Sequence, residues 1–162
     1  MMAKKTAMYG LLLAFGLILS YVEVLLPLDF IAYGVKLGLA NLICVYLLYR
    51  KGPFAALGIN LLRIFLVALL FGNVMSFVYS VCGALLSLLL MVLCKTVRLF
   101  SPVGVSVAGG VAHNIGQLLA AMVFLGSSAV LYYTPVLLIS GVVCGFLIGL
   151  ASSFLLARVH NI

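Results

Sequence analysis

Few side chains in this sequence could bind a polar solute or transfer a proton. Of its 162 residues, nine are Lys or Arg, two are Asp or Glu and two are His. One guanidinium, one imidazole and several amides stand inside long apolar runs, with one carboxylate and one ammonium nearer the ends of those runs. Such groups can hold an anionic or polar solute by hydrogen bonds. The candidate binding residues are Arg63, His113, Asn114, Gln117, Asn60, Asn41, Lys36 and Glu23.

The same inventory argues against an enzyme. Glu23 and Asp29 are the two carboxylates of the sequence, so acid–base work by paired carboxylates and an Asp-rich magnesium–diphosphate site are both implausible. Ser106 and His113 are seven residues apart, about 10 Å along a helix and too far for a direct hydrogen bond. His160 stands far along the chain from His113, and no Cys-x-x-Cys pair occurs. We therefore expect no catalytic role, no metal ion and no cofactor.

The composition indicates where these groups must sit. Hydrophobic residues make up 67% of the chain and charged residues 7%, against roughly 45–50% and 25% in soluble domains. A soluble domain could not cover its surface with so few charges, which excludes soluble enzymes, nucleic-acid binders and disordered chains despite the net charge of +7. We expect an all-α polytopic membrane protein, with residues 1–162 forming one integral-membrane domain.

Charged residues, glycines and prolines divide the chain into apolar segments. A membrane-spanning helix needs about 20 mostly apolar residues. The sequence predicts six transmembrane helices, of which the second is the shortest: Thr6–Leu26, Tyr33–Tyr49, Pro53–Phe71, Val74–Cys94, Val103–Leu125 and Val130–Ala157.

The basic residues predict the orientation of these helices. Lys and Arg concentrate in cytoplasmic segments of membrane proteins. If the N-terminus is cytoplasmic, seven of the nine basic residues fall in inner segments and none in an outer loop: Lys4, Lys5, Arg50, Lys51, Lys95, Arg98 and Arg158. The sequence thus predicts a multi-pass protein of the cell membrane with both termini in the cytoplasm.

In this orientation most candidate binding residues fall in one layer, from the midplane towards the outer face, and Glu23 and Lys36 lie above it. Ionisable side chains within a span face a cavity or a partner, because lipid does not solvate them. The layer therefore predicts a binding cavity open to the outside. Structural roles stay open as well: Arg63 could pair with Glu23, His113 could bond a backbone carbonyl, the asparagines could join helices, and Lys36 could extend to the headgroups.

Three stretches resemble a known membrane family. They are SYVEVLLPL (Ser20–Leu28), GVKLGLANL (Gly34–Leu42) and GGVAHNIGQL (Gly109–Leu118). The family is called Gx transporter or heptaprenyl diphosphate synthase component I, and it is in turn similar to the S components of energy-coupling factor (ECF) transporters.

The resemblance to S components implies a six-helix bundle that captures a vitamin-like micronutrient from outside. It implies a lid at Leu28–Tyr33 and docking on a transmembrane coupling protein that carries two ATPases. Small residues of the first helix would form the docking face: Ala3, Ala7, Gly10 and Ala14.

The sequence leaves three functions open. The favoured one is a substrate-capture subunit of an importer. The second is an accessory membrane subunit of prenyl diphosphate synthesis, as the family's other name implies. The third is a stand-alone secondary carrier, in which His113 would relay protons.

Overall fold

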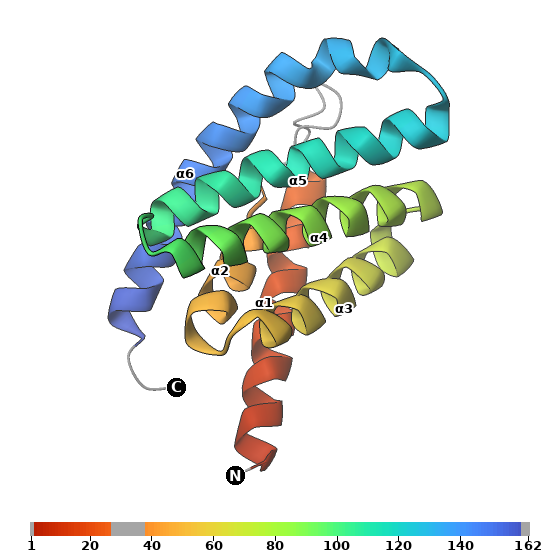
Figure 1. Cartoon of the computed structure of the whole chain (residues 1–162). Helices are drawn as coiled ribbons and strands as arrows, with labels where there is room; N and C mark the ends of the chain where they lie inside the picture. The colour runs from red at the N-terminus through yellow and green to blue at the C-terminus, as the bar shows by residue number, and fades with distance from the viewer. Residues whose placement is uncertain (1, 27–37, 160–162) are drawn as a thin grey trace.

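The computed structural model describes residues 2–26 and 38–159, and this part of the chain is helical with no strand. The all-α class is therefore confirmed. Figure 1 shows six α-helices, with a short 3₁₀-helix before the last. Their bounds are α1 Met2–Leu25, α2 Asn41–Arg50, α3 Pro53–Phe71, α4 Val74–Val97, α5 Pro102–Leu125, η2 Ser128–Tyr133 and α6 Thr134–Arg158.

Local sequence signals set several of these boundaries. Gly52 has a φ of 97°, a left-handed conformation that glycine adopts easily, and Pro53 then begins α3. The side chain of Asn73 caps α4 by accepting a hydrogen bond from the Ser76 N–H at 2.8 Å. Gly126 ends α5 with a φ of 59°. The ends predicted for the third, fourth and fifth spans lie within three residues of the ends of α3, α4 and α5.

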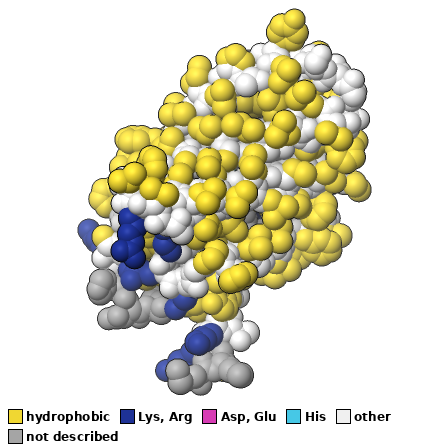
Figure 2. All heavy atoms as spheres, viewed as in Figure 1, with side chains coloured by type: hydrophobic (Ala, Val, Ile, Leu, Met, Phe, Trp, Pro, Cys, Tyr) yellow, Lys and Arg dark blue, Asp and Glu magenta, His cyan; other side chains and the backbone are white. Residues whose placement is uncertain are grey.

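Five segments are long and apolar enough to cross a membrane: Ala3–Leu25, Pro53–Phe71, Val74–Val97, Pro102–Leu125 and Ser128–Arg158. Hydrophobic side chains cover most of the surface in Figure 2, as expected of helices that face lipid. The chain is thus a multi-pass membrane protein.

The second predicted span, Tyr33–Tyr49, is different. Its described part is a turn at residues 38–40 followed by α2, which has 10 residues. Ten helical residues extend about 15 Å, half of the roughly 30 Å hydrocarbon core. The described residues therefore do not confirm six transmembrane helices. Residues 33–37 lie outside the described part.

Helix α2 lies at the centre of the hydrophobic core. Its residues Ile43–Leu48 are all buried. They pack with Ala56 of α3, Met91 of α4 and Val105 of α5. A short helix surrounded by longer ones explains why its sequence is apolar on every side.

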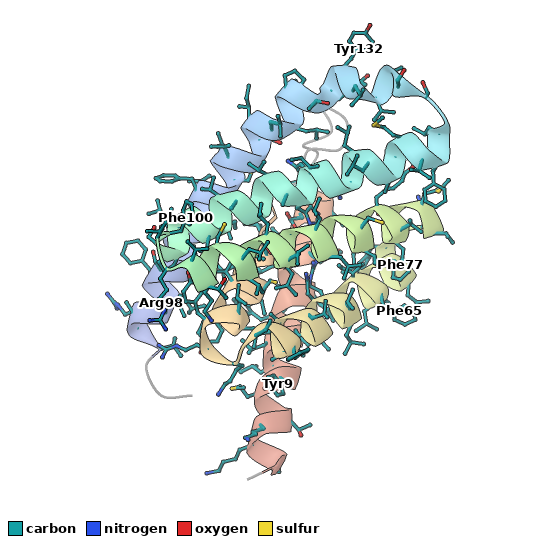
Figure 3. All side chains as sticks on the ribbon, viewed as in Figure 1. Tyr9, Phe65, Phe77, Arg98, Phe100 and Tyr132 are labelled. Carbon is teal, nitrogen blue, oxygen red and sulfur yellow. The ribbon has the colours of Figure 1, made fainter. Side chains whose placement is uncertain are left out.

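The long helices pack in two groups. Helix α5 lies between α4 and α6, and glycines bring these three backbones into contact. Helix α3 contacts α1, α2 and α4, and Phe65 and Phe77 join α3 to α4 edge to face, with ring centroids 6.3 Å apart (Figure 3).

The basic side chains gather at one end of the molecule, dark blue in Figure 2. Arg50 of α2 donates hydrogen bonds to the carbonyls of Leu156 and Val159 at the end of α6, at 2.6 and 2.7 Å. Lys95 of α4 donates to the Leu48 carbonyl at 2.6 Å. Two of the predicted inner basic residues therefore also cap the carboxyl ends of helices. We call this the basic end.

Candidate functional site

A cavity of about 400 Å³ lies among α1, α3, α4, α5 and α6, beside the residues that lead into α2. Six of the eight predicted binding residues line it: Glu23, Asn41, Asn60, Arg63, His113 and Asn114. The structure thus brings together predicted residues from four helices, α1, α2, α3 and α5. Pockets of about 300–1,000 Å³ with few polar groups are typical of small-molecule sites.

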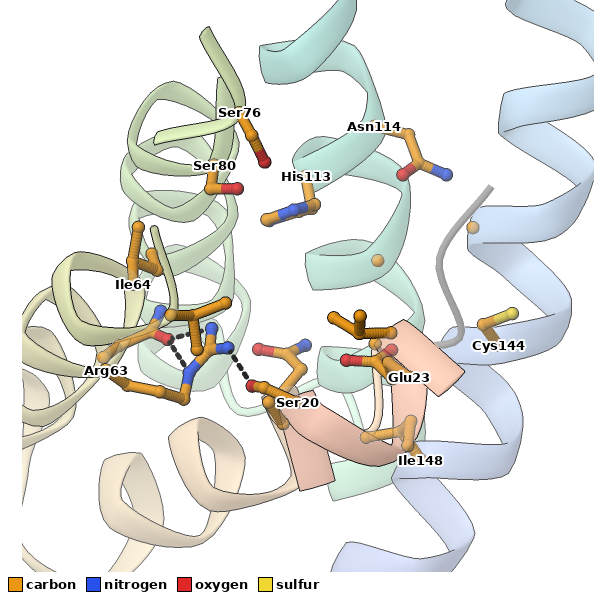
Figure 4. A pocket seen from close by; sticks show the side chains of 18 of the residues that line it. Ser20, Glu23, Arg63, Ile64, Ser76, Ser80, His113, Asn114, Cys144 and Ile148 are labelled. Carbon is orange, nitrogen blue, oxygen red and sulfur yellow. Dashed lines mark hydrogen bonds between the residues drawn. The ribbon is translucent and has the colours of Figure 1, made fainter. Parts of the chain in front are cut away.

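The guanidinium of Arg63 is held in place by two neutral side chains (Figure 4). It donates to Asn60 Oδ1 through Nε at 3.2 Å and Nη2 at 2.8 Å, and to Ser20 Oγ through Nη1 at 2.8 Å. Gly16 makes room for the side chain, because a Cβ there would lie 3.2 Å from Arg63 Cδ. The arrangement fixes a guanidinium at the cavity wall through hydrogen bonds to two neutral side chains.

Glu23 is the carboxylate that lines the cavity. Its Oε1 accepts a hydrogen bond from the Leu39 N–H at 3.0 Å. In Figure 4 it lies beyond Ser20 as seen from Arg63, on the side of Cys144 and Ile148. The alternative of a direct Arg63–Glu23 ion pair is not what the structure shows, because the guanidinium bonds Ser20 and Asn60 instead.

His113 lies on the opposite wall, against α4. A Cβ on Gly83 would stand 3.0 Å from His113 Cε1. Figure 4 shows the imidazole pointing towards the side where Ser76 and Ser80 lie, and both serines line the cavity. The imidazole and two hydroxyls make this wall able to donate and accept hydrogen bonds.

Asn114 lines the cavity, but its amide is engaged with α6. Nδ2 donates to the Leu137 carbonyl at 2.5 Å and to Ser140 Oγ at 3.3 Å. The structure therefore favours the interhelical role that the sequence left open for this residue. Asn60 differs, because its side chain bonds Arg63 at the cavity wall.

The other predicted residues fall outside this cavity or outside the described part. Gln117 does not line the cavity; its Cγ packs on α4, 3.0 Å from where a Cβ on Gly83 would be. Lys36 and the expected lid at Leu28–Tyr33 lie outside the described residues. The predicted docking residues are all exposed on α1: Ala3, Ala7, Gly10 and Ala14.

Sequence reasoning missed the small residues that build the site. Gly16 and Ser20 are four apart on α1, and Glu23 follows three later, so all three share one helix face. Ser20 is only 3% exposed. Ser76 and Ser80 show the same four-residue spacing on α4. Small and polar residues at helical spacing within an apolar run were the signal that could have identified both faces.

The described residues contain no group of three His, Cys, Asp or Glu side chains that could hold a metal ion. The cavity's polar side chains are a cation, a carboxylate, an imidazole, hydroxyls and amides. This set can bind a polar solute by charge and hydrogen bonds.

Comparison with known proteins identifies the family. The sequence profile of the family described as heptaprenyl diphosphate synthase component I matches residues 12–155. No curated protein and no solved structure matches the chain. The matched region includes α2 to α5 in full, parts of α1 and α6, and all the described residues that line the cavity. This chain is therefore a member of the heptaprenyl diphosphate synthase component I family.

Proposed function

We propose that this chain is the membrane-embedded substrate-binding subunit of an importer, similar to an ECF S component, and that it captures a small polar solute from the outer side. The observation that supports this most is the cavity, in which Arg63, Glu23 and His113 come from three helices to line about 400 Å³ within an apolar bundle. Charged groups within a membrane bundle mark a solute pathway or site more often than they stabilise the fold.

The position of the cavity supports capture from outside. It is lined by the carboxyl-terminal parts of α1 and α3 and by the amino-terminal part of α4. These parts lie away from the basic end, where α4 and α6 finish. Since basic segments stay in the cytoplasm, this orientation puts both termini inside and the cavity in the outer half of the bilayer.

The chain would not itself hydrolyse ATP or catalyse a reaction. Its sequence has no GxxxxGK[ST] phosphate loop and two carboxylates in all. The energy for import would come from a transmembrane coupling protein with an ATPase pair. The exposed face of Ala3, Ala7, Gly10 and Ala14 on α1 is available for that contact, since small residues let helices approach closely in membranes.

Thiol labelling tests the outward cavity. Cys144 lines the cavity, whereas Cys82 and Cys94 do not. With the other three cysteines replaced by Ala, an impermeant methanethiosulfonate anion added to right-side-out vesicles should modify Cys144. A chain that retains only Cys94, near the basic end, is the matched control and should not react from that side. Labelling of Cys144 only in inside-out vesicles, or in neither, would refute capture from outside.

Co-purification tests the partner. Replacing Ala7 and Ala14 by Leu should abolish association with an ATPase pair in native membranes while the chain still folds. Leu at Gly58, which also has open space at its Cβ position but lies on α3, is the control. Association that survives the α1 substitutions would contradict the docking face.

The family description favours a second candidate, an accessory membrane subunit of prenyl diphosphate synthesis. In this case the chain would assist a separate catalytic component, since its own sequence lacks acidic diphosphate motifs. Prenyl transfer measured in membranes with and without this chain separates the two candidates. Activity that requires the chain, together with an unreactive Cys144, would favour the second.

A further inference from the structure

We propose that the basic end binds anionic phospholipids of the adjacent leaflet through four exposed cations, which we call the cationic rim: Lys4, Lys5, Arg98 and Arg158. None of these residues lines the cavity. The proposal therefore goes beyond the proposed function and does not depend on it.

The basic end carries an excess of positive charge. Seven of the nine Lys and Arg residues belong to it (Figure 2). Glu23 is the one carboxylate side chain among the described residues, and it lines the cavity instead. Since like charges repel each other, anions from outside the chain should stabilise this end.

The seven cations divide into two sets. Arg50 and Lys95 donate hydrogen bonds to helix carbonyls, and Lys51 also interacts within the chain. The four residues of the cationic rim are exposed at the ends of α1, α4 and α6. The phosphate groups of lipid headgroups can reach exposed ammonium and guanidinium groups, and such phosphates are favoured partners of both.

Apolar side chains beside Arg98 indicate that the anion belongs to a lipid. Leu99 is 82% exposed and Val97 is 57% exposed, and water solvates such side chains poorly. At the boundary between headgroups and acyl chains, apolar side chains contact the acyl chains while a neighbouring Arg extends to the phosphates. Because this chain crosses the membrane, each end of its helix bundle meets that boundary.

The backbone does not explain why residue 98 is an arginine. Arg98 ends α4 in the left-handed conformation, with a φ of 59°, as Gly126 ends α5. Glycine adopts this conformation more easily than arginine. Helix α4 ends at the basic end and α5 ends away from it (Figure 1). A use for the positive charge at the basic end accounts for this difference.

Lipid competition tests the proposal on the purified full-length chain. The protein in detergent and low-salt buffer is offered equal amounts of phosphatidylglycerol and phosphatidylcholine with the same acyl chains, and native mass spectrometry counts the lipids that stay bound. Each basic residue near an anionic surface strengthens binding about fivefold, so phosphatidylglycerol should be retained at least fivefold over phosphatidylcholine. The preference should decline as salt is added, because salt screens exposed charges. Equal retention of the two lipids would refute the proposal.

Two charge-matched double variants test the residues. Arg98→Gln with Arg158→Gln removes two cations of the cationic rim and should lower the preference at least threefold. Arg50→Gln with Lys95→Gln removes the same charge from side chains that bond carbonyls, and it should leave the preference unchanged. Should this second pair fail to fold, Lys51→Gln against Arg98→Gln gives the same comparison with one charge. An equal loss in the variants compared would mean that net charge attracts the lipid, and the assignment to the cationic rim would be wrong.

Other anions are outcomes of the same experiment. Inorganic phosphate and glycerol phosphate carry the charge of the headgroup without acyl chains, and displacement of phosphatidylglycerol by either at equal concentration would show a site for soluble phosphate. If the Arg98 and Arg158 double variant keeps its lipid preference but loses the ATPase pair on co-purification, the cations bind an acidic protein. Either result would overturn the lipid proposal. Neither affects the labelling of Cys144, so the test of capture from outside stands separately.

Discussion

The two sides of the cavity are built differently. In the α4–α5–α6 group, glycines place backbone against backbone: a Cβ on Gly116 would lie 2.9 Å from Gly83 Cα, and one on Gly110 would lie 2.5 Å from the Gly141 carbonyl oxygen. In the α1–α3 group the glycines have more room. A Cβ on Gly58 would meet nothing within 4 Å, and one on Gly16 would meet only the side chain of Arg63 and, at 3.8 Å, that of Ile43.

This difference assigns separate tasks to the two groups. Two helices whose backbones touch have no space to slide past each other, because protein interiors are packed as densely as organic crystals. Where side chains make the contacts, the side chains can change rotamer and let the helices move. We therefore expect α4–α5–α6 to act as a rigid wall, and α1 and α3, which carry Glu23 and Arg63, to adjust when a solute binds.

Gly110→Ala should have the largest effect, because it drives a methyl group into the backbone of α6. Overpacking commonly costs about 1–3 kcal/mol, and here the obstacle is backbone, so we expect a loss of about 3 kcal/mol in the free energy of unfolding. Gly58→Ala is the matched control and should stabilise the chain by about 0.5–1 kcal/mol, since Ala favours helix over Gly. Equal unfolding temperatures for the two variants in detergent would remove the distinction between the groups.

Arg50→Gln should have the next largest effect, because Arg50 links α2 to the rigid wall at the basic end. It donates to two carbonyls at the end of α6, and hydrogen bonds to charged groups contribute about 1.5–3 kcal/mol. We expect a loss of about 2 kcal/mol with no change in access to Cys144. Lys5→Gln removes an exposed charge from α1 and should leave the unfolding temperature unchanged; a similar loss in both variants would point to net charge as the cause.

The fold was largely predictable because lipid imposes simple rules. Apolar length and helix-breaking residues predicted the long helices, and the basic residues do gather at one end. The exception was α2. Its apolar run was predicted to belong to a span, Tyr33–Tyr49, which the described residues do not confirm. A helix buried by protein on all sides and one facing lipid have similar compositions, so the sequence did not indicate that α2 lies inside the core.

The sequence predicted most of the charged and amide residues that line the cavity, but it did not predict the small residues beside them. Arg63, Glu23 and His113 stand out within apolar runs because lipid does not solvate them. Ser20 and Gly16 do not stand out, since serine and glycine are common in membrane helices. Which amides face the cavity and which join helices depends on helix rotation, and the sequence did not specify it for Asn114 or Gln117.

Asn114 and Asn60 allow the same substitution to be made on each wall. Asn114→Ala removes a side chain that joins α5 to α6, so it should lower the free energy of unfolding by about 1 kcal/mol, within the range measured for interhelical bonds in membranes. Asn60→Ala removes the main support of the Arg63 guanidinium, so it should weaken solute binding instead. If Asn114→Ala impairs binding more than stability, Asn114 contacts the solute and the wall is not simply structural.

Gly16→Ala should have the smallest effect on stability. It tests most directly whether the α1–α3 group can adjust. The added methyl group would lie 3.2 Å from Arg63 Cδ, and a flexible side chain can move by a few tenths of an ångström at little cost. The free energy of unfolding should stay within about 1 kcal/mol of that of the parent chain, since the Ala gains helix propensity. Solute affinity should fall only a few-fold, because Ser20 and Asn60 still hold the guanidinium. A collapse in stability like that of Gly110→Ala would mean that α1 packs as rigidly as α5, and the adjustment to solute would then have to come from α3.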